Sequence, residues 1–191
     1  MSCFVVYQTM KVSRCQLDGL LLIEPAAFGD ARGFFLETWN QRRYAEIGLP
    51  EAFVQDNLSF SRRGTLRGLH YQNPCPQGKL VSVIQGEVYD VVVDLRRSSP
   101  TFGKWYAVRL SSENKLQLYV PPGFAHGFAV LSETTLFHYK CTDFYAPQHE
   151  LTLLWNDPTL AIPWPVEAPI ISPKDQQGRR LQDLPPERLF P

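Results

Sequence analysis

Hydrophobic residues along this chain occur in short runs that alternate with turns containing proline or glycine. The runs are rich in Val, Leu, Phe, Tyr and Thr, which is typical of β-strands. Gly86 is expected to divide the longest run into two antiparallel strands, since glycine commonly interrupts a strand. The sequence predicts strands over residues 20–25, 33–37, 65–72, 80–95, 104–110, 116–122, 126–132, 134–145 and 151–155.

Helical structure is expected in only two places. Residues 40–48 predict one helix, with Asn40 as its N-cap and Gly48 at its end. The proline-rich and charged C-terminal segment is expected to form short helical turns on the outside. We find no repeat or linker, so a single domain over residues 1–191 is expected. Many short strands of this kind predict an antiparallel sandwich or small barrel, with a ligand site at its mouth.

Composition argues against a protein that binds nucleic acid or membranes through its overall charge, and against a disulfide-rich protein. The 191 residues carry 19 basic and 19 acidic side chains, so no global field recruits nucleic acid or an anionic membrane. The cysteines are too sparse for a disulfide framework and form no metal-binding pair; they are Cys3, Cys15, Cys75 and Cys141. The early apolar run "CFVVY" is too short for a signal peptide or a membrane span, so a soluble cytoplasmic protein is expected.

Strand periodicity predicts which side chains share a face, because alternate residues of a strand point the same way. Arg67 and His70 differ in parity, so both can line one cavity only if the strand shifts phase between them. Gly68 could supply that shift as a β-bulge. The pairs expected to share a face are Tyr139 with Tyr145, Gln55 with Asn57, Phe35 with Glu37, and His70 with Gln72.

The stretch "TLRGLHYQ" places His70 in a predicted strand, where it could be a metal ligand, a proton carrier or a packed core residue. The segment "PPGFAH", ending at His126, resembles the second motif of the cupin superfamily. The first cupin motif usually supplies His-x-His, but here the third position is Gln72, a poor ligand for a soft divalent metal. We therefore predict no metal, and favour acid–base chemistry for His70 over a core role.

Nine ordered blocks carry a more specific resemblance. The chain resembles the dTDP-4-dehydrorhamnose 3,5-epimerase family over nearly its whole length. The blocks are "FGDARGFFLE", "FVQDNLSFS", "LRGLHYQ", "QGKLV", "GEVYDVVVDLR", "SPTFGKW", "PPGFAHGFAVLSE", "YKCTDFY" and "HELTLLWNDPTLAIPWP". The resemblance implies a metal-free cupin-type jelly roll, all-β with a few short peripheral helices. It also implies a homodimer that needs no cofactor and inverts C3 and C5 of a dTDP-linked 4-keto-6-deoxyhexose.

The resemblance also implies catalytic roles. His70 would be the base, Tyr139 the acid on the other face of the sugar, and Lys79 a cation near the keto oxygen. Asp175 would orient and stabilise the imidazolium. Such a set suits removal of a hydrogen alpha to a ketone, which needs a base and stabilisation of the enolate. From the residues alone, Lys79 could be a solvated loop lysine, Asp175 a helix cap and Tyr139 a core residue.

Substrate-binding residues carry over in the same way. The positions near the nucleotide are Arg32, Phe35 and Glu37, and those near the diphosphate and sugar are Gln55, Asn57 and Arg67. His126 would contact the sugar or help stabilise the enolate, and Tyr145 would stack on the thymine. Glu150 and Lys174 match further binding positions. Arginine suits a diphosphate because its planar fork bonds two oxygens.

This chain departs from the family pattern at three positions. Leu58, Cys141 and Phe144 stand where histidine, threonine and tyrosine are usual. We expect none of these differences to touch the base, the acid or the cation. The segment "MSCFVVYQ" precedes the first matched block.

Three other readings remain open on the sequence alone. A single-carbon epimerase, acting at C3 or C5 of a dTDP-4-keto-6-deoxysugar, would keep much the same catalytic set. A catalytically silent sugar-nucleotide-binding cupin is disfavoured by the intact catalytic residues. A metal-dependent cupin oxygenase or isomerase is disfavoured by the missing His-x-His pair.

Overall fold

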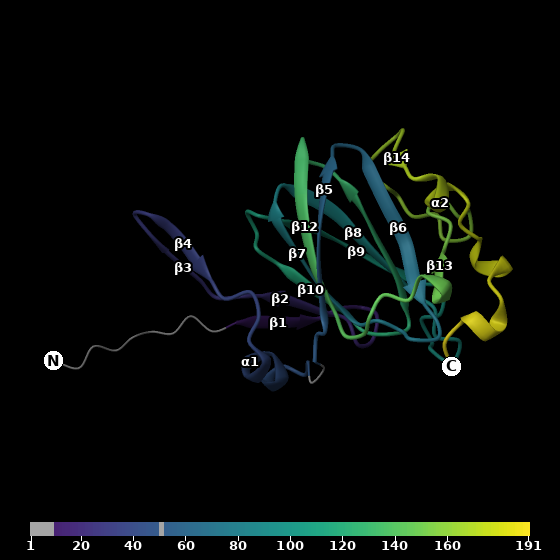
Figure 1. Cartoon of the computed structure of the whole chain (residues 1–191), viewed down its shortest axis with the longest axis horizontal. Helices are drawn as coiled ribbons and strands as arrows, with labels where there is room; N and C mark the ends of the chain where they lie inside the picture. The colour runs from purple at the N-terminus through teal and green to yellow at the C-terminus, as the bar shows by residue number, and fades with distance from the viewer. Residues whose placement is uncertain (1–9, 50–51) are drawn as a thin grey trace.

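The computed structural model describes residues 10–49 and 52–191 (Figure 1). Cys3 and the early apolar run lie outside the described residues. The strands are β1 (Lys11–Arg14), β2 (Leu21–Glu24), β3 (Ala27–Asp30), β4 (Gly33–Leu36), β5 (Gln55–Arg62), β6 (Thr65–Gln72), β7 (Lys79–Gln85), β8 (Glu87–Asp94), β9 (Trp105–Ser111), β10 (Gln117–Val120), β11 (Phe124–Val130), β12 (Thr134–Cys141), β13 (Glu150–Thr152) and β14 (Ile170–Ile171). The helices are α1 (Gln41–Glu46) and α2 (Pro173–Gln176), and the 3-10 turns are η1 (Pro147–His149), η2 (Leu181–Asp183) and η3 (Pro186–Arg188).

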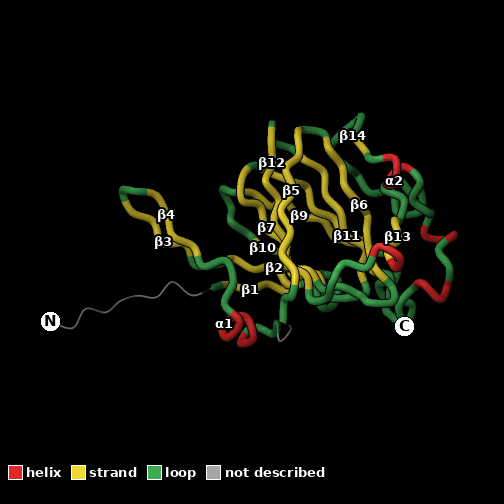
Figure 2. Tube along the Cα trace, in the orientation of Figure 1, coloured by secondary structure: helices red, strands yellow, loops and turns green. Residues whose placement is uncertain are grey.

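Two antiparallel sheets form the body of the molecule (Figure 2). The front sheet has the strand order β1-β2-β10-β7-β12-β5, and the back sheet has the order β13-β6-β11-β8-β9. Strand β14 adds to β6 in parallel. This arrangement confirms the predicted all-β jelly roll with a few short peripheral helices.

The main core lies between the two sheets, where inward-facing side chains of both meet. It includes Val81 and Phe137 from the front sheet and Val88, Val92 and Phe128 from the back sheet, all nearly inaccessible to solvent. The outer face of the back sheet is covered by the C-terminal segment, which Figure 1 shows in yellow beside β6 and β13. Burial of apolar side chains between the outer face of the back sheet and this segment stabilises its position.

Helix α1 forms where the sequence predicted a helix. The Asn40 side chain accepts hydrogen bonds from the backbone N–H groups of Arg42 and Arg43, which caps the first turn. Gly48 follows the helix with φ +95°, a conformation that glycine adopts without a Cβ penalty. Within the described part of the chain, no helix is both long and apolar enough to cross a membrane.

Several strand predictions need correction. Gly86 does separate two strands, but β7 and β8 belong to opposite sheets and do not pair with each other. The strand predicted over residues 134–145 ends at Cys141, and the one predicted over 151–155 is β13 (Glu150–Thr152). In each case the predicted run continues past the point where strand pairing ends, which side-chain type alone does not reveal.

Strands β3 and β4 form a separate hairpin that projects beyond the two sheets (Figure 1). Its aromatic side chains are exposed: Phe28 by 44%, Phe34 by 61% and Phe35 by 69%. Arg32 at its tip pairs with Asp30, and the pair is largely solvated. An exposed run of aromatic residues on a projecting hairpin is unusual for an isolated chain.

Candidate active site

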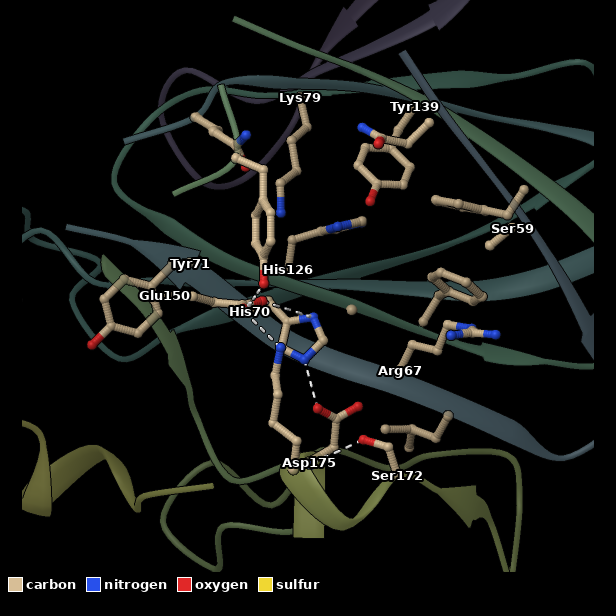
Figure 3. A pocket seen from close by; sticks show the side chains of 18 of the residues that line it. Ser59, Arg67, His70, Tyr71, Lys79, His126, Tyr139, Glu150, Ser172 and Asp175 are labelled. Carbon is tan, nitrogen blue, oxygen red and sulfur yellow. Dashed lines mark hydrogen bonds and ion pairs between the residues drawn. The ribbon is translucent and has the colours of Figure 1, made fainter. Parts of the chain in front are cut away.

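A cavity of about 630 Å³ opens between the two sheets (Figure 3). Of the 14 residues that the sequence implicated, the structure brings 11 to its walls: Gln55, Asn57, Arg67, His70, Lys79, His126, Tyr139, Tyr145, Glu150, Lys174 and Asp175. These residues come from β5, β6, β7, β11, β12, β13, α2 and the loop after β12. The cavity therefore collects side chains that lie far apart in the sequence.

His70 and Asp175 form a hydrogen-bonded pair on the back-sheet side of the cavity. The distance from His70 Nε2 to Asp175 Oδ1 is 2.6 Å, and the other carboxylate oxygen accepts from the Gly68 backbone N–H. Asp175 is buried, and although burial raises its pKa, the bonds from His70 and Gly68 bring the pKa below its usual value. An ionised Asp175 fixes the His70 tautomer with Nε2 protonated and leaves Nδ1 free to accept a proton.

The alternative role of Asp175 as a helix cap is wrong. Ser172 caps α2, and its hydroxyl accepts from the Asp175 backbone N–H at 3.1 Å. The short helix instead places the Asp175 carboxylate against His70.

A bulge at Gly68 explains how Arg67 and His70 both reach the cavity. His126 pairs with His70 and Phe128 pairs with Arg67, so β6 uses one residue more than β11 between these two pairs. A Cβ on Gly68 would lie 2.6 Å from the Cα of Gly127, too close for any other residue. The predicted phase shift at Gly68 is confirmed.

Tyr139 and Lys79 lie on the opposite wall, on neighbouring strands of the front sheet. Burial raises the pKa of Tyr139, as do the nearby Cys141 and Glu150, so the phenol keeps its proton at neutral pH. Burial lowers the pKa of Lys79, while Cys141, Glu150 and Asp90 favour its ammonium form. The Tyr139 phenol and the Lys79 amine thus face the His70 imidazole across the cavity, as Figure 3 shows.

Glu150 organises the mouth of the cavity. Its Oε2 accepts from the Tyr145 hydroxyl at 2.7 Å and pairs with Lys174 Nζ at 2.6 Å. Tyr145 lies in the loop after β12 rather than on a continuous strand with Tyr139, yet it reaches the same cavity. Phe144 is 66% exposed and does not line the cavity, as predicted.

His126 is buried and makes a hydrogen-bonded pair with Asp90 that sequence reasoning missed. Its Nε2 lies 2.9 and 3.0 Å from the two oxygens of Asp90, which is fully buried. Burial raises the pKa of Asp90, while His126 and Lys79 oppose that rise. The signal was present in the sequence: Asp90 is a charged residue inside the apolar run "VYDVVVDL", and a buried carboxylate needs a partner.

The inner face of β5 supplies a polar row. Exposure alternates along this strand, and Gln55, Asn57 and Ser59 all line the cavity. The next inward residue, Ser61, accepts a hydrogen bond from Arg67 Nε at 3.0 Å. The predicted shared face of Gln55 and Asn57 is confirmed, and their amides hydrogen-bond to each other at 3.0 Å.

Arg32, Phe35 and Glu37 do not reach this cavity. Arg32 and Phe35 lie on the projecting β3–β4 hairpin, and Glu37 follows it, paired with Arg43 of α1. The hairpin leaves the body on the side away from β6 and α2, the elements that carry His70 and Asp175 (Figure 1). Their expected contact with a nucleotide is therefore not made within the cavity of the same chain.

Two of the positions at which this chain departs from the family pattern, Leu58 and Cys141, lie in different surroundings, and only Cys141 is in the cavity. Leu58 is 62% exposed on the outer face of β5, remote from the chemistry. Cys141, however, is buried, lines the cavity and pairs directly with Lys79 across the front sheet. The expectation that no difference touches the proposed cation is therefore wrong for Cys141.

Gln72, at the third position of the incomplete cupin motif, has its side chain engaged in hydrogen bonds to the backbone. The Gln72 side-chain amide donates to the Cys75 and Phe144 carbonyls and accepts from the Ala146 N–H. Across residues 10–49 and 52–191, His, Cys, Asp and Glu side chains form no group of three or more able to hold a metal ion. The donor set thus does not fit a cupin metal centre.

The family model for dTDP-4-dehydrorhamnose 3,5-epimerase matches residues 14–183. The chain belongs to this family. It is 57% identical over 176 residues to the dTDP-4-dehydrorhamnose 3,5-epimerase of Pseudomonas aeruginosa, covering 91% of this chain and 97% of the relative. The dTDP-4-dehydrorhamnose 3-epimerase of Streptomyces niveus is 38% identical over 184 residues, covering 95% and 89%. The Pseudomonas aeruginosa 3,5-epimerase is thus more similar to this chain than that single-carbon enzyme is.

A solved structure supports the same assignment. The dTDP-6-deoxy-D-glucose-3,5-epimerase of Legionella pneumophila Philadelphia 1, in complex with dTDP-4-keto-L-rhamnose, superposes with a TM-score of 0.93 at 52% identity. The match covers 95% of this chain and 97% of that one. The predicted cupin-type jelly roll and the predicted enzyme class, an isomerase acting on a sugar nucleotide, are confirmed.

Proposed function

We propose that this protein converts dTDP-4-dehydro-6-deoxy-D-glucose to dTDP-4-dehydro-L-rhamnose by inverting C3 and C5, as a step of dTDP-L-rhamnose biosynthesis. The observation that carries the proposal is the His70–Asp175 pair on one sheet facing Tyr139 on the other across a cavity. The whole chain acts as one domain in this proposal. We place the enzyme in the cytoplasm, where nucleotide sugars are made.

The chemistry follows from this arrangement. His70 Nδ1 removes the hydrogen alpha to the C4 ketone, while Asp175 stabilises the imidazolium that forms. Lys79 stabilises the negative charge that develops on the C4 oxygen. Tyr139 returns a proton from the opposite face, which inverts the carbon. Before the second inversion, Tyr139 regains a proton from water and His70 gives one up; a ring shift then brings the second carbon to the same two groups.

Product analysis tests the proposal. The purified protein is incubated with dTDP-4-keto-6-deoxyglucose, the 4-keto group is reduced with borohydride, and the released sugars are identified. We expect L-configured 6-deoxyhexoses, rhamnose among them. Recovery of D-configured sugars inverted at C3 alone would instead support the single-carbon alternative, and recovery of unchanged substrate would contradict both.

We also propose that the enzyme is a homodimer in which each β3–β4 hairpin completes the cavity of the partner. Two observations support a second copy as the partner. The outer face of the front sheet exposes Leu58 by 62% and Phe60 by 57% on β5, and Ile84 by 52% on β7, with β12 between these two strands; such an apolar surface is fit for self-association. The hairpin residues with an expected nucleotide contact, Arg32 and Phe35, project away from their own cavity.

Subunit complementation tests this dimer. One variant carries His70→Ala, and the other carries Arg32→Ala with Phe35→Ala. In a mixed dimer, the chain with the changed hairpin keeps His70, and its cavity receives the intact hairpin of the His70→Ala chain. One of the two cavities is therefore complete. Co-refolding the two weak variants should therefore restore roughly a quarter of wild-type activity. No gain on mixing would contradict hairpin exchange.

Phe34→Ala is the matched control. The Phe34 ring contacts Lys115 of its own chain, so this variant should keep activity.

A further inference from the structure

His70 lies between two carboxylates that approach its ring to different distances (Figure 3). Asp175 holds Nε2 at 2.6 Å, whereas Glu150 Oε1 lies 4.0 Å from Nδ1 on the opposite edge of the ring. The Asp175 side chain is 4% exposed and the Glu150 side chain 14%. Asp175 is therefore a fixed hydrogen-bond partner, while Glu150 stands on the side from which the substrate proton arrives.

If one base inverts two carbons, it must lose the first proton before it can take the second, and this is the step in which Glu150 could act. After the first abstraction His70 carries a proton on both nitrogens and must lose the new one before it can act again. Transfer of the Nε2 proton to Asp175 would leave Nδ1 protonated and the base blocked. The proton has to leave from Nδ1, so its acceptor must lie on the Nδ1 side of the ring.

We propose that Glu150 is the relay that takes this proton from His70 and passes it to solvent. This inference rests on the function proposed above. The Nδ1–H bond breaks, its electron pair stays on the imidazole, and an O–H bond forms on Glu150 Oε1. Loss of that proton to water regenerates the carboxylate. The 4.0 Å gap is longer than a hydrogen bond, so one bridging water or a small side-chain shift carries the transfer.

The contacts of Glu150 suit it to this work. Tyr145 and Lys174 both hold Oε2, which leaves Oε1 directed at His70. Burial raises the pKa of Glu150, but the bonds from Lys174 and Tyr145 outweigh it and bring the pKa below its usual value, so the carboxylate is ionised at rest and releases a proton to water rather than retaining it. Tyr145 is 51% exposed and the Lys174 side chain 50%, so the far side of the carboxylate borders solvent.

The test is buffer rescue of Glu150→Gln, which keeps the shape of the side chain and removes its ability to take a proton. In dilute buffer we expect kcat to fall roughly tenfold. Added imidazole, a small diffusible base, should raise the kcat of this variant towards the wild-type value and leave wild-type kcat unchanged. Glu24→Gln is the matched control, since Glu24 also pairs with a lysine but lies on β2, exposed and outside the cavity.

Other outcomes overturn the relay. A role in substrate binding alone predicts a raised KM with kcat unchanged and no response to imidazole. A fall in kcat that imidazole does not relieve contradicts the relay too. If Glu150→Gln does not fold, Glu150→Asp replaces it; its carboxylate is shorter by one methylene, and it should show a smaller loss with the same imidazole response. A wild-type enzyme that inverts neither carbon would defeat the proposed function, whereas an active wild type with a buffer-insensitive variant defeats the relay only.

Discussion

His70→Ala should abolish deuterium uptake from solvent at both C3 and C5 of the substrate. The structure places His70 on the cavity wall with its Nε2 bonded to the buried Asp175 carboxylate, and the loss of a general base costs up to about 10⁴-fold. In the proposed mechanism His70, whose side chain is 26% exposed, acts on the sugar rather than on the nucleotide, so binding of dTDP should remain. The measurement is NMR of the substrate in deuterated water, with dTDP affinity measured alongside.

Exchange retained at either carbon above roughly a hundredth of the wild-type rate would contradict a single base, given the size of general-base effects. His126 would then be the candidate for the remaining proton, since it lines the same cavity and has its own carboxylate partner in Asp90. In the present account His126 contacts the sugar and takes no proton from carbon.

Tyr139→Phe should separate deprotonation from inversion. The substitution removes only the hydroxyl, so the ring keeps its packing beside Phe137 and the fold should survive. His70 can still remove the hydrogen, so slow exchange with solvent should continue. The proton from the opposite face is missing, so formation of the inverted sugar should fall about a thousandfold. Exchange and product stereochemistry are measured in the same reaction.

Tyr145→Phe is the matched control for this variant. Its ring is 51% exposed at the mouth of the cavity, and its hydroxyl bonds to Glu150. Removal of that hydroxyl leaves the aromatic face available to the nucleotide, so the loss should be far smaller than for Tyr139→Phe. If Tyr139→Phe makes the L-sugar at nearly the wild-type rate, the acid is another group, and our assignment of Tyr139 is wrong.

Local sequence patterns predicted the elements that depend on local forces. The Asn40 cap, the stop at Gly48 and the bulge at Gly68 all follow from backbone geometry that a few neighbouring residues impose. Alternation along β5 placed Gln55 and Asn57 on one face. The same logic failed for residues 134–145, because periodicity assumes a straight strand and β12 ends at Cys141.

Local sequence patterns could not predict that His70 pairs with Asp175. These residues are 105 positions apart, and strand parity says nothing about which distant segment packs against β6. Only the resemblance to a known family pointed to Asp175 as the partner of His70, and the residues alone left a helix cap open. Likewise, the projection of the β3–β4 hairpin follows from its lack of pairing to either sheet, which neither composition nor periodicity encodes.

The central claim is that one base and one acid in this cavity invert both carbons next to the ketone. Its most direct test is incubation of the wild-type protein with dTDP-4-keto-6-deoxyglucose in deuterated water, followed by NMR of the ring positions. The account predicts solvent deuterium at both C3 and C5 of an L-configured product. Deuterium at one carbon only, or inversion without any deuterium from solvent, would contradict it.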